Sequence, residues 1–365
     1  MSNPAPLVVT TTPPDSFTST PLTPPPSEEK GSRVSTSQIL DGVRNFQRGQ
    51  ALPPWHRFSL QEDEYTRLLA EVGKESESFQ GFWKHKLKYD YFPSTSTFIF
   101  RMPTATHERF ITSVVQETTR QLQTLATADS LTSEFARQLD SCGSTSIHFP
   151  DEYGRHDPDG SFGHTQAQYP GVIFEVSYSQ KRRDLGRLAD DYILGSDGNI
   201  RVVIGLDIEY LARGKGKEVS GKVATISVWR PRISDDGNGG ELTAHQEIVD
   251  LEFRDKDGIA NPSPGIGISL RLDDFATSAL HPKPMSERVF IPATTLTIFL
   301  NNAEKAESMI KENMGAKVTL GKVVKKRRRQ STPIEELDET KEKTFKEEEE
   351  RAEKRARKAD KAWKP

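Results

Sequence analysis

The chain has 365 residues, of which 34% are apolar and 28% are charged, and its formal net charge is −3. Its single cysteine excludes an intramolecular disulfide and a cysteine-based zinc site. There is no run of about 18 apolar residues to cross a membrane, and no basic-then-apolar signal peptide at the N-terminus. We therefore expect a protein that is neither secreted nor membrane-bound.

Composition divides the chain into three parts. Residues 1–37 are rich in Pro, Ser and Thr and predict a disordered leader, because they contain too little apolar surface to fold. A folded domain is expected over residues 52–312, with its core over 97–229. Residues 322–365 form a charged helical or disordered tail with 16 Lys/Arg against 11 Asp/Glu, a net +5 that leaves −8 before it. A non-specific attraction to nucleic acid would thus come from the tail or a local patch.

The domain opens with a helix pattern. Ser59 to Glu62 has the spacing of a capping box, and an apolar helical face follows until Gly73 ends it. Trp83–Tyr91 interleaves basic and aromatic residues, a composition that can stack bases and contact phosphates. The alternative, which we favour, is that these aromatic side chains enter the core.

Strand and helix patterns then alternate. Thr97–Met102 predicts a strand that Pro103 stops, and Thr106 predicts the N-cap of the next helix. Further strands are expected over 144–149, 171–178, 200–208, 223–229 and 247–253, a helix over 185–193, an element over 270–275 and a final helix over 294–310. This order predicts an α/β domain with a mixed central sheet flanked by helices on both faces, between disordered N- and C-terminal tails.

Two carboxylates carry the chemistry. Glu175 is the one charge in the apolar run Gly171–Tyr178, where it is costly unless it is neutralised, and Asp159 follows Pro158 on the preceding strand. Together with the backbone carbonyl of Val176 they would form an all-oxygen pocket that suits Mg²⁺ or Mn²⁺. Such an ion can activate water for phosphodiester hydrolysis.

Each acid also has a simpler interpretation. Asp159 could simply be the first residue of a turn after Pro158. Glu175 could form an ion pair with Lys181 or Arg182. Glu108 either adds a third acid or is a carboxylate favoured by the helix dipole, and we favour the second. His156 and His164 are too far apart in sequence for a metal motif, and we place them on surface loops.

These residues carry a resemblance to a known family. Pro158-Asp159, then Glu175-Val176-Ser177, within the order helix–strand–strand–strand–helix–strand, resembles the PD-(D/E)XK restriction-endonuclease-like superfamily. The string from Gly171 to Ile193 is similar to its Uma-type branch and to fungal proteins that share this nuclease fold, and Arg101-Met102-Pro103 followed by His107-Glu108 resembles the strand-to-helix entry of that branch. The resemblance covers about residues 97–210. It implies a restriction-endonuclease-like core (αβββαβ) with Asp159 and Glu175 as metal ligands.

One position departs from the family pattern. Glu-x-Lys would place a lysine at 177, where this chain has Ser177. The basic role could pass to Lys181 and a polar role to Gln180, so the expected catalytic residues are Asp159, Glu175, Lys181 and Gln180, with Asp159, Glu175 and Val176 at the metal. The expected function is a Mg²⁺-dependent nuclease. The alternative is a catalytically inactive nuclease-fold module that serves binding or interaction in the nucleus.

A compact basic cluster lies in the tail. It consists of Lys325, Lys326, Arg327, Arg328 and Arg329 and predicts recognition by a nuclear import receptor. The alternatives are solvated charge and direct contact with nucleic acid. We therefore expect a nuclear, or else cytoplasmic, protein with nucleic acid among its candidate partners.

Overall fold

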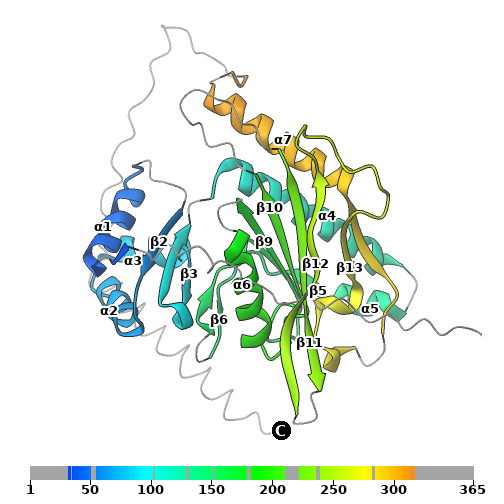
Figure 1. Cartoon of the computed structure of the whole chain (residues 1–365), viewed down its shortest axis with the longest axis horizontal. Helices are drawn as coiled ribbons and strands as arrows, with labels where there is room; N and C mark the ends of the chain where they lie inside the picture. The colour runs from blue at the N-terminus through cyan, green and yellow to red at the C-terminus, as the bar shows by residue number, and fades with distance from the viewer. Residues whose placement is uncertain are drawn as a thin grey trace, which may run out of the picture. The chain divides into compact units, whose positions relative to one another are not determined.

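The computed structural model of the chain describes residues 32–33, 35–50, 55–101, 103–128, 131–150, 153–178, 182–209, 222–235, 239–281, 284–312 and 314–316. The elements below all belong to one unit, Met1–Met314. The sequence predictions for Gln180, Lys181 and the tail cluster Lys325–Arg329 lie outside the described residues. The described part is a mixed α/β structure with two six-stranded sheets and one two-stranded sheet (Figure 1).

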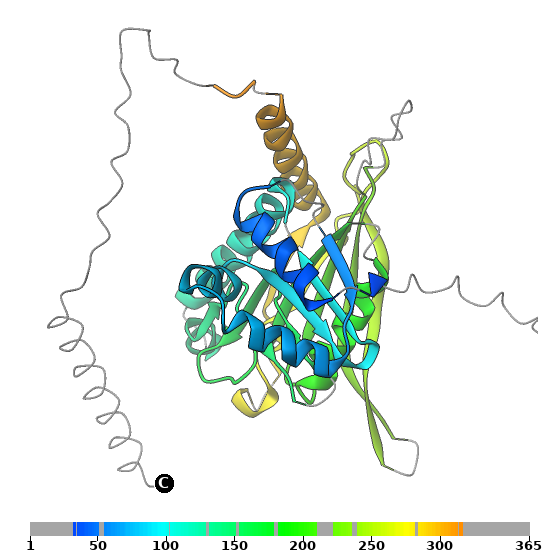
Figure 2. The ribbon, with the colours of Figure 1, turned by 90° about the vertical axis from the view of Figure 1, so that its left-hand side faces the viewer.

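The N-terminal part of the unit builds the first six-stranded sheet, called sheet A. Its strand order is β1 (Ser32–Arg33), β2 (Trp55–Ser59), β4 (Thr97–Arg101), β3 (Lys88–Phe92), β7 (Arg155–His156) and β6 (Ile147–His148). Three helices, α1 (Thr36–Gln47), α2 (Glu62–Val72) and α3 (Glu77–His85), lie over one face and turn toward the viewer in Figure 2. Alternation along β3 and β4 turns Tyr89, Tyr91, Phe98 and Phe100 to these helices and Phe92 and Ile99 to the other face.

Helix α1 lies almost entirely between the predicted leader, residues 1–37, and residue 52, where the folded domain was expected to begin. Ile39, Leu40 and Val43 are fully or almost fully buried against the rest of the helical layer. Ser35 begins the helix with a capping box closed by Gln38. Three apolar residues on one face are enough to pack this helix against the domain. The mostly polar composition of the segment explains why the sequence did not predict it.

Two predicted helix starts are displaced by two residues. Gln61 and not Ser59 is the N-cap of α2, because Ser59 belongs to β2 and pairs with Thr97. Thr104 and not Thr106 caps α4 (Ala105–Thr127), accepting a hydrogen bond from the His107 N–H at 3.2 Å. The favoured interpretation of Trp83–Tyr91 is confirmed, since its three aromatic side chains are buried.

The second sheet, called sheet B, has the order β12 (Gly240–Arg254), β11 (Ala224–Asp235), β10 (Val202–Ile208), β9 (Val172–Tyr178), β8 (Gly160–His164) and β5 (Leu139–Ser141). β9 and β10 are parallel and are joined by α6 (Arg182–Gly195), whereas the other pairs are antiparallel. A helix between two parallel strands is the connection that such a pair requires.

Sheet B is covered on both faces. Phe174 and Val176 face a core shared with α4, with α7 (Ala293–Lys311) and with the small sheet of β13 (Gly267–Arg271) and β14 (Arg288–Pro292), while α5 (Leu131–Arg137) lies next to α4. Ile173 faces α6 and the inner face of sheet A. α6 packs so closely that a Cβ on Gly205 would lie 3.0 Å from Leu185. The predicted element over 270–275 is divided, because β13 ends at Arg271 and a 3₁₀ helix occupies Leu272–Phe275.

β11 and β12 form a long two-stranded ribbon that extends past the neighbouring strands (Figure 2). β12 is the outermost described strand of sheet B and carries Glu241, Glu247, Asp250 and Glu252. Its register against β11 is irregular, and Asp250 has a φ of 47°. The buried end of β12 is anchored by Arg254, which donates to Glu304 of α7 at 2.8 and 2.9 Å. No helix among the described residues is long and apolar enough to cross a membrane.

Candidate functional site

Asp159 and Glu175 lie side by side between sheet A and sheet B. Gly160 of β8 is paired with Phe174 of β9, and the Asp159 N–H donates to the Phe174 carbonyl at 3.2 Å. This register puts Asp159 next to Glu175 on the sheet face that α6 covers. Both side chains are only 1% exposed.

Arg101 of β4 joins the two acids. One of its terminal nitrogens lies 3.4 Å from Asp159 Oδ1 and 3.2 Å from Glu175 Oε2. Its Nε lies 3.1 Å from Asp90 Oδ2, and its other terminal nitrogen donates to the Asp157 carbonyl. A single guanidinium thus contacts three carboxylates. We call Asp90, Asp157, Asp159, Glu175 and Arg101 the carboxylate cluster.

Asp159 has further partners on both of its oxygens. Its Oδ2 lies 3.0 Å from His107 Nε2 and accepts a hydrogen bond from the Val176 N–H at 2.9 Å. Its Oδ1 lies 3.9 Å from the ammonium of Lys88. Val176 therefore contacts Asp159 through its backbone N–H, and its carbonyl as a metal ligand stays a prediction.

Glu175 has a phenol as its second partner. Tyr192 of α6 donates its hydroxyl to Glu175 Oε1 at 2.7 Å. Ser177, the residue at the expected lysine position, lies on the same strand and donates to Asp207 Oδ1 of β10 at 2.5 Å. The hydroxyl of Ser177 therefore forms part of a neighbouring hydrogen bond between β9 and β10.

The prediction that His156 and His164 lie on surface loops is wrong. His156 is completely buried, with Nε2 2.9 Å from Asp191 and Nδ1 3.4 Å from Asp90. His164 is 8% exposed and its ring packs against Phe135. Both belong to short strands, β7 and β8, and such brief segments have little periodicity in sequence.

The pKa values of Asp159 and Glu175 are shifted in opposite directions. Burial would raise the pKa of Asp159, but the positive charges of His107 and Arg101 hold it well below its usual range. Burial, followed by the neighbouring charge of Asp159, raises the pKa of Glu175 to about 8 in spite of Arg101. The Asp159 carboxylate is therefore the charged member of the pair, and Glu175 gains its proton more readily than a solvated glutamate.

Two buried histidines are stabilised in their charged form. Burial alone would lower the pKa of His107, but Asp159 raises it to about 9. Burial opposes protonation of His156 in the same way, but its hydrogen bonds to the carboxylates of Asp191 and Asp90 raise its pKa to about 9. Cationic side chains therefore balance much of the buried negative charge.

This arrangement does not fit a hydrated divalent ion. The Arg101 guanidinium takes the position between Asp159 and Glu175 in which the ion would lie. The adjoining cavity, lined by Glu175, Val176 and Ser177, has a volume of about 20 Å³, room for one water. Mg²⁺ keeps several of its waters when it binds a protein. No group of three or more His, Cys, Asp or Glu side chains within the described ranges is arranged around a metal position.

Sequence reasoning missed most partners of the two acids. The missed residues lie on β3 and β4 of the other sheet and are Lys88, Asp90 and Arg101. Only Arg101 had a signal in the sequence, because it is a buried charge at the end of the apolar strand TFIFR. Glu108 lies in the first turn of α4, half exposed and 3.4 Å from Lys88, in line with the favoured helix-dipole interpretation.

Comparisons with known proteins add no family. No protein-family model matches the chain, and no curated protein sequence is significantly similar to it.

Proposed function

We propose that this chain is a nuclease-like protein in which Arg101 replaces the catalytic metal, so that the fold serves binding and not phosphodiester hydrolysis. The observation that carries the proposal is the contact of one Arg101 nitrogen with both Asp159 and Glu175. A fixed cation at that position neutralises the pair without a bound ion. It also closes the route by which a scissile phosphate would reach the two acids.

The order of elements supports the restriction-endonuclease-like core that is part of this proposal. Helix α4 is followed by β5, β8 and β9, then by α6 and β10, which corresponds to helix–strand–strand–strand–helix–strand when the short helix α5 and the short β6 and β7 of sheet A are set aside. Asp159 directly precedes the second of these strands, and Glu175 lies on the third. Their placement is the one that the resemblance implies.

The cost of the cluster indicates that it descends from a functional site. Buried charges lose several kcal/mol each of hydration, which their mutual attraction repays only in part. A packed apolar core at this place would cost less free energy than three carboxylates around an arginine. Clusters of strongly perturbed ionisable groups occur most often at functional sites, and this supports a nuclease ancestry.

The second candidate is the Mg²⁺-dependent nuclease itself. The adjacency of Asp159 and Glu175 on one sheet face favours it. Hydrolysis would require Arg101 to leave the pair and the cavity beside Glu175 to widen. Lys88, which is 21% exposed, would then be the cation nearest to an incoming phosphate.

Cleavage and metal binding separate the two candidates. We expect no Mg²⁺- or Mn²⁺-dependent cleavage of plasmid DNA or of single-stranded RNA by the full chain beyond that of a variant with Asp159→Asn and Glu175→Gln. We also expect Mn²⁺ to shift the melting temperatures of both proteins equally, because neither has a free carboxylate pair. Cleavage that needs the metal and disappears in the variant would support the nuclease and refute our proposal.

The nuclear location has its own test. A fluorescent protein joined to residues 322–365 should accumulate in the nucleus, because Lys325–Arg329 presents five consecutive positive charges to an import receptor. Changing these five residues to Gln should return the fusion to an even distribution. The control changes five other basic residues of the tail: Lys343, Lys346, Arg351, Lys354 and Arg357. Equal accumulation of both variants would contradict the assignment of the import signal.

A further inference from the structure

A second cavity lies away from the carboxylate cluster, near the edge strands β6 of sheet A and β5 of sheet B. We call it the edge pocket, and its volume is about 320 Å³. It is lined by Cys142, Thr145, Ser146, Ile147, His148, Ser161, Gly163, His164, Ala167, Gln168, Tyr169 and Pro170. These residues come from β6 and β8 and from the loops that follow β5 and β8. The volume falls in the lower part of the range of small-molecule sites.

The walls of the edge pocket carry no formal charge. None of its lining residues is Asp, Glu, Lys or Arg, although such residues make up 28% of the chain. Burial lowers the pKa of His148 and His164, so both rings are neutral at pH 7. Burial, together with Asp140, raises the pKa of Cys142, so its thiol is neutral as well. A charged ligand would lose its hydration here without gaining a counter-ion.

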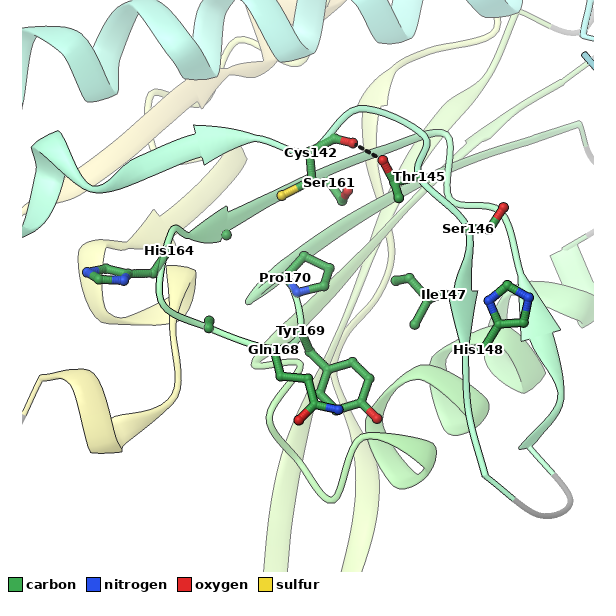
Figure 3. Close-up of a pocket in the computed structure, with 12 residues that line it drawn as sticks. Cys142, Thr145, Ser146, Ile147, His148, Ser161, His164, Gln168, Tyr169 and Pro170 are labelled. Carbon is green, nitrogen blue, oxygen red and sulfur yellow. Dashed lines mark hydrogen bonds between the residues drawn. The ribbon is translucent and has the colours of Figure 1, made fainter. Parts of the chain in front are cut away.

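The apolar part of the pocket wall can pack against a ring. Figure 3 shows Pro170 and Ile147 between the Cys142, Thr145 and Ser161 side chains on one side and Gln168 and Tyr169 on the other. Pro170, Ile147 and the Tyr169 ring provide an apolar wall, and Tyr169 is itself held by stacking on Phe149. Aromatic and aliphatic walls of this kind bind rings through their faces.

The polar groups at the rim can orient such a ring. The Thr145 and Ser161 hydroxyls already donate to the carbonyls of Cys142 and Gly143, at 2.7 and 2.9 Å, so they offer lone pairs to a ligand N–H. Across the described residues, no protein hydrogen bond uses the amide of Gln168 or the hydroxyl of Tyr169. These two groups can donate to or accept from a ligand.

We propose that the edge pocket binds an uncharged, ring-bearing small molecule with a hydrogen-bonding amide or ring N–H. The site is independent of the carboxylate cluster and stands whether or not the chain hydrolyses phosphodiesters. Cys142 lies in its wall and is the only cysteine of the chain, so the rate at which this thiol reacts reports occupancy of the pocket.

The test uses the full chain and three matched probes. Benzamide, benzoate and benzamidine share one ring and differ in charge, and nicotinamide and indole extend the neutral set. Labelling of Cys142 with a maleimide should slow as a neutral ring is added, by about ten-fold at ten times its dissociation constant. Benzoate and benzamidine should leave the rate unchanged, and saturation-transfer NMR should detect only the neutral rings.

Two tryptophan variants connect the effect to the pocket. Thr145→Trp fills the pocket from its exposed rim and should abolish protection of Cys142, whereas Ser144→Trp changes an exposed neighbour outside the lining and should retain it. The ratio of labelling rates with and without ligand is compared in each variant, after circular dichroism shows that both are folded. Protection by none of the neutral rings, equal protection by benzoate, or protection that persists in Thr145→Trp would overturn the proposal.

Discussion

Replacing Arg101 by Met should destabilise the protein by about 3–5 kcal/mol, the usual cost of removing one partner from a buried ion pair. Methionine retains much of the side-chain volume, so the loss reports the charge and not a cavity. Asp90, Asp159 and Glu175 would then be left together without their shared guanidinium. Urea unfolding of wild type and variant at pH 7 measures the difference in free energy.

Mn²⁺ gives this experiment a second readout. If Arg101 replaces a metal, the variant should gain an affinity for divalent ions that wild type lacks, and its melting temperature should rise with Mn²⁺ concentration. Saturation at 100 times the dissociation constant would return about 2.7 kcal/mol. The rise should vanish when Asp159→Asn and Glu175→Gln are added to the variant.

A surface arginine provides the matched control. Arg120 of α4 pairs with Glu117 and is largely exposed, so Arg120→Met should change the free energy of unfolding far less than Arg101→Met and create no response to Mn²⁺. A loss for Arg101→Met no larger than that for Arg120→Met would show that the guanidinium does not neutralise the cluster. The proposed replacement of the metal would then fail.

Raising the pH from 6.5 to 9.5 should strongly destabilise the folded chain. The pKa values of His107 and His156 are about 9 in the folded state, against 6.5 for a solvated histidine. A group whose folded pKa is raised stabilises the fold fully below its unfolded pKa and loses that contribution as pH rises through the folded value. Each histidine accounts for roughly 3 kcal/mol across this interval.

Glu175 acts in the same direction at lower pH. Its pKa is raised from 4.5 to about 8, so its contribution declines between those values. Asp159 acts at acidic pH, because its pKa is lowered in the folded state. Its ionised carboxylate stabilises the fold above pH 3.8, and this contribution is lost as the pH falls below that value. The maximum of stability should therefore lie on the weakly acidic side of neutrality.

Free energies of unfolding at pH 6.5, 8 and 9.5 test the alkaline loss. His156→Gln keeps a polar side chain that cannot gain a charge, so it should be less stable than wild type at pH 6.5 and lose less between pH 6.5 and 9.5. His85→Gln, at an exposed position, should follow the wild-type profile. A wild-type protein equally stable at pH 6.5 and 9.5 would refute the assignment of charge to the buried histidines.

The sequence predicted the parts of the fold that depend on local pattern. The run over 171–178 became β9, the run over 200–208 contains β10, and the final helix began and ended within one residue of the expected limits. Long apolar runs and amphipathic helices can be recognised in the sequence because their periodicity is repeated several times. The adjacency of Asp159 and Glu175 also followed from pattern, since each is a single acid next to or within a buried strand.

The second sheet and its contribution to the site could not be read in the same way. A single mixed sheet was expected, whereas Arg101, Asp90 and Lys88 reach the acids from β3 and β4 of sheet A. Along the chain, Arg101 is 58 residues from Asp159 and 74 residues from Glu175. Pairing between remote segments depends on the packed tertiary structure and leaves no local periodicity. His107 belonged to the segment before α4 that resembles the family, but its contact with Asp159 was not predicted.

The outermost strand of sheet B has a consequence for how the molecule behaves in a crowded solution. Fifteen residues of extended backbone at a border would ordinarily template the addition of another chain. In β12, four acids repel a second copy, and the left-handed Asp250 and the irregular register bend the border away from flatness. We therefore expect the exposed edge of β12 to disfavour the addition of a strand from a second chain.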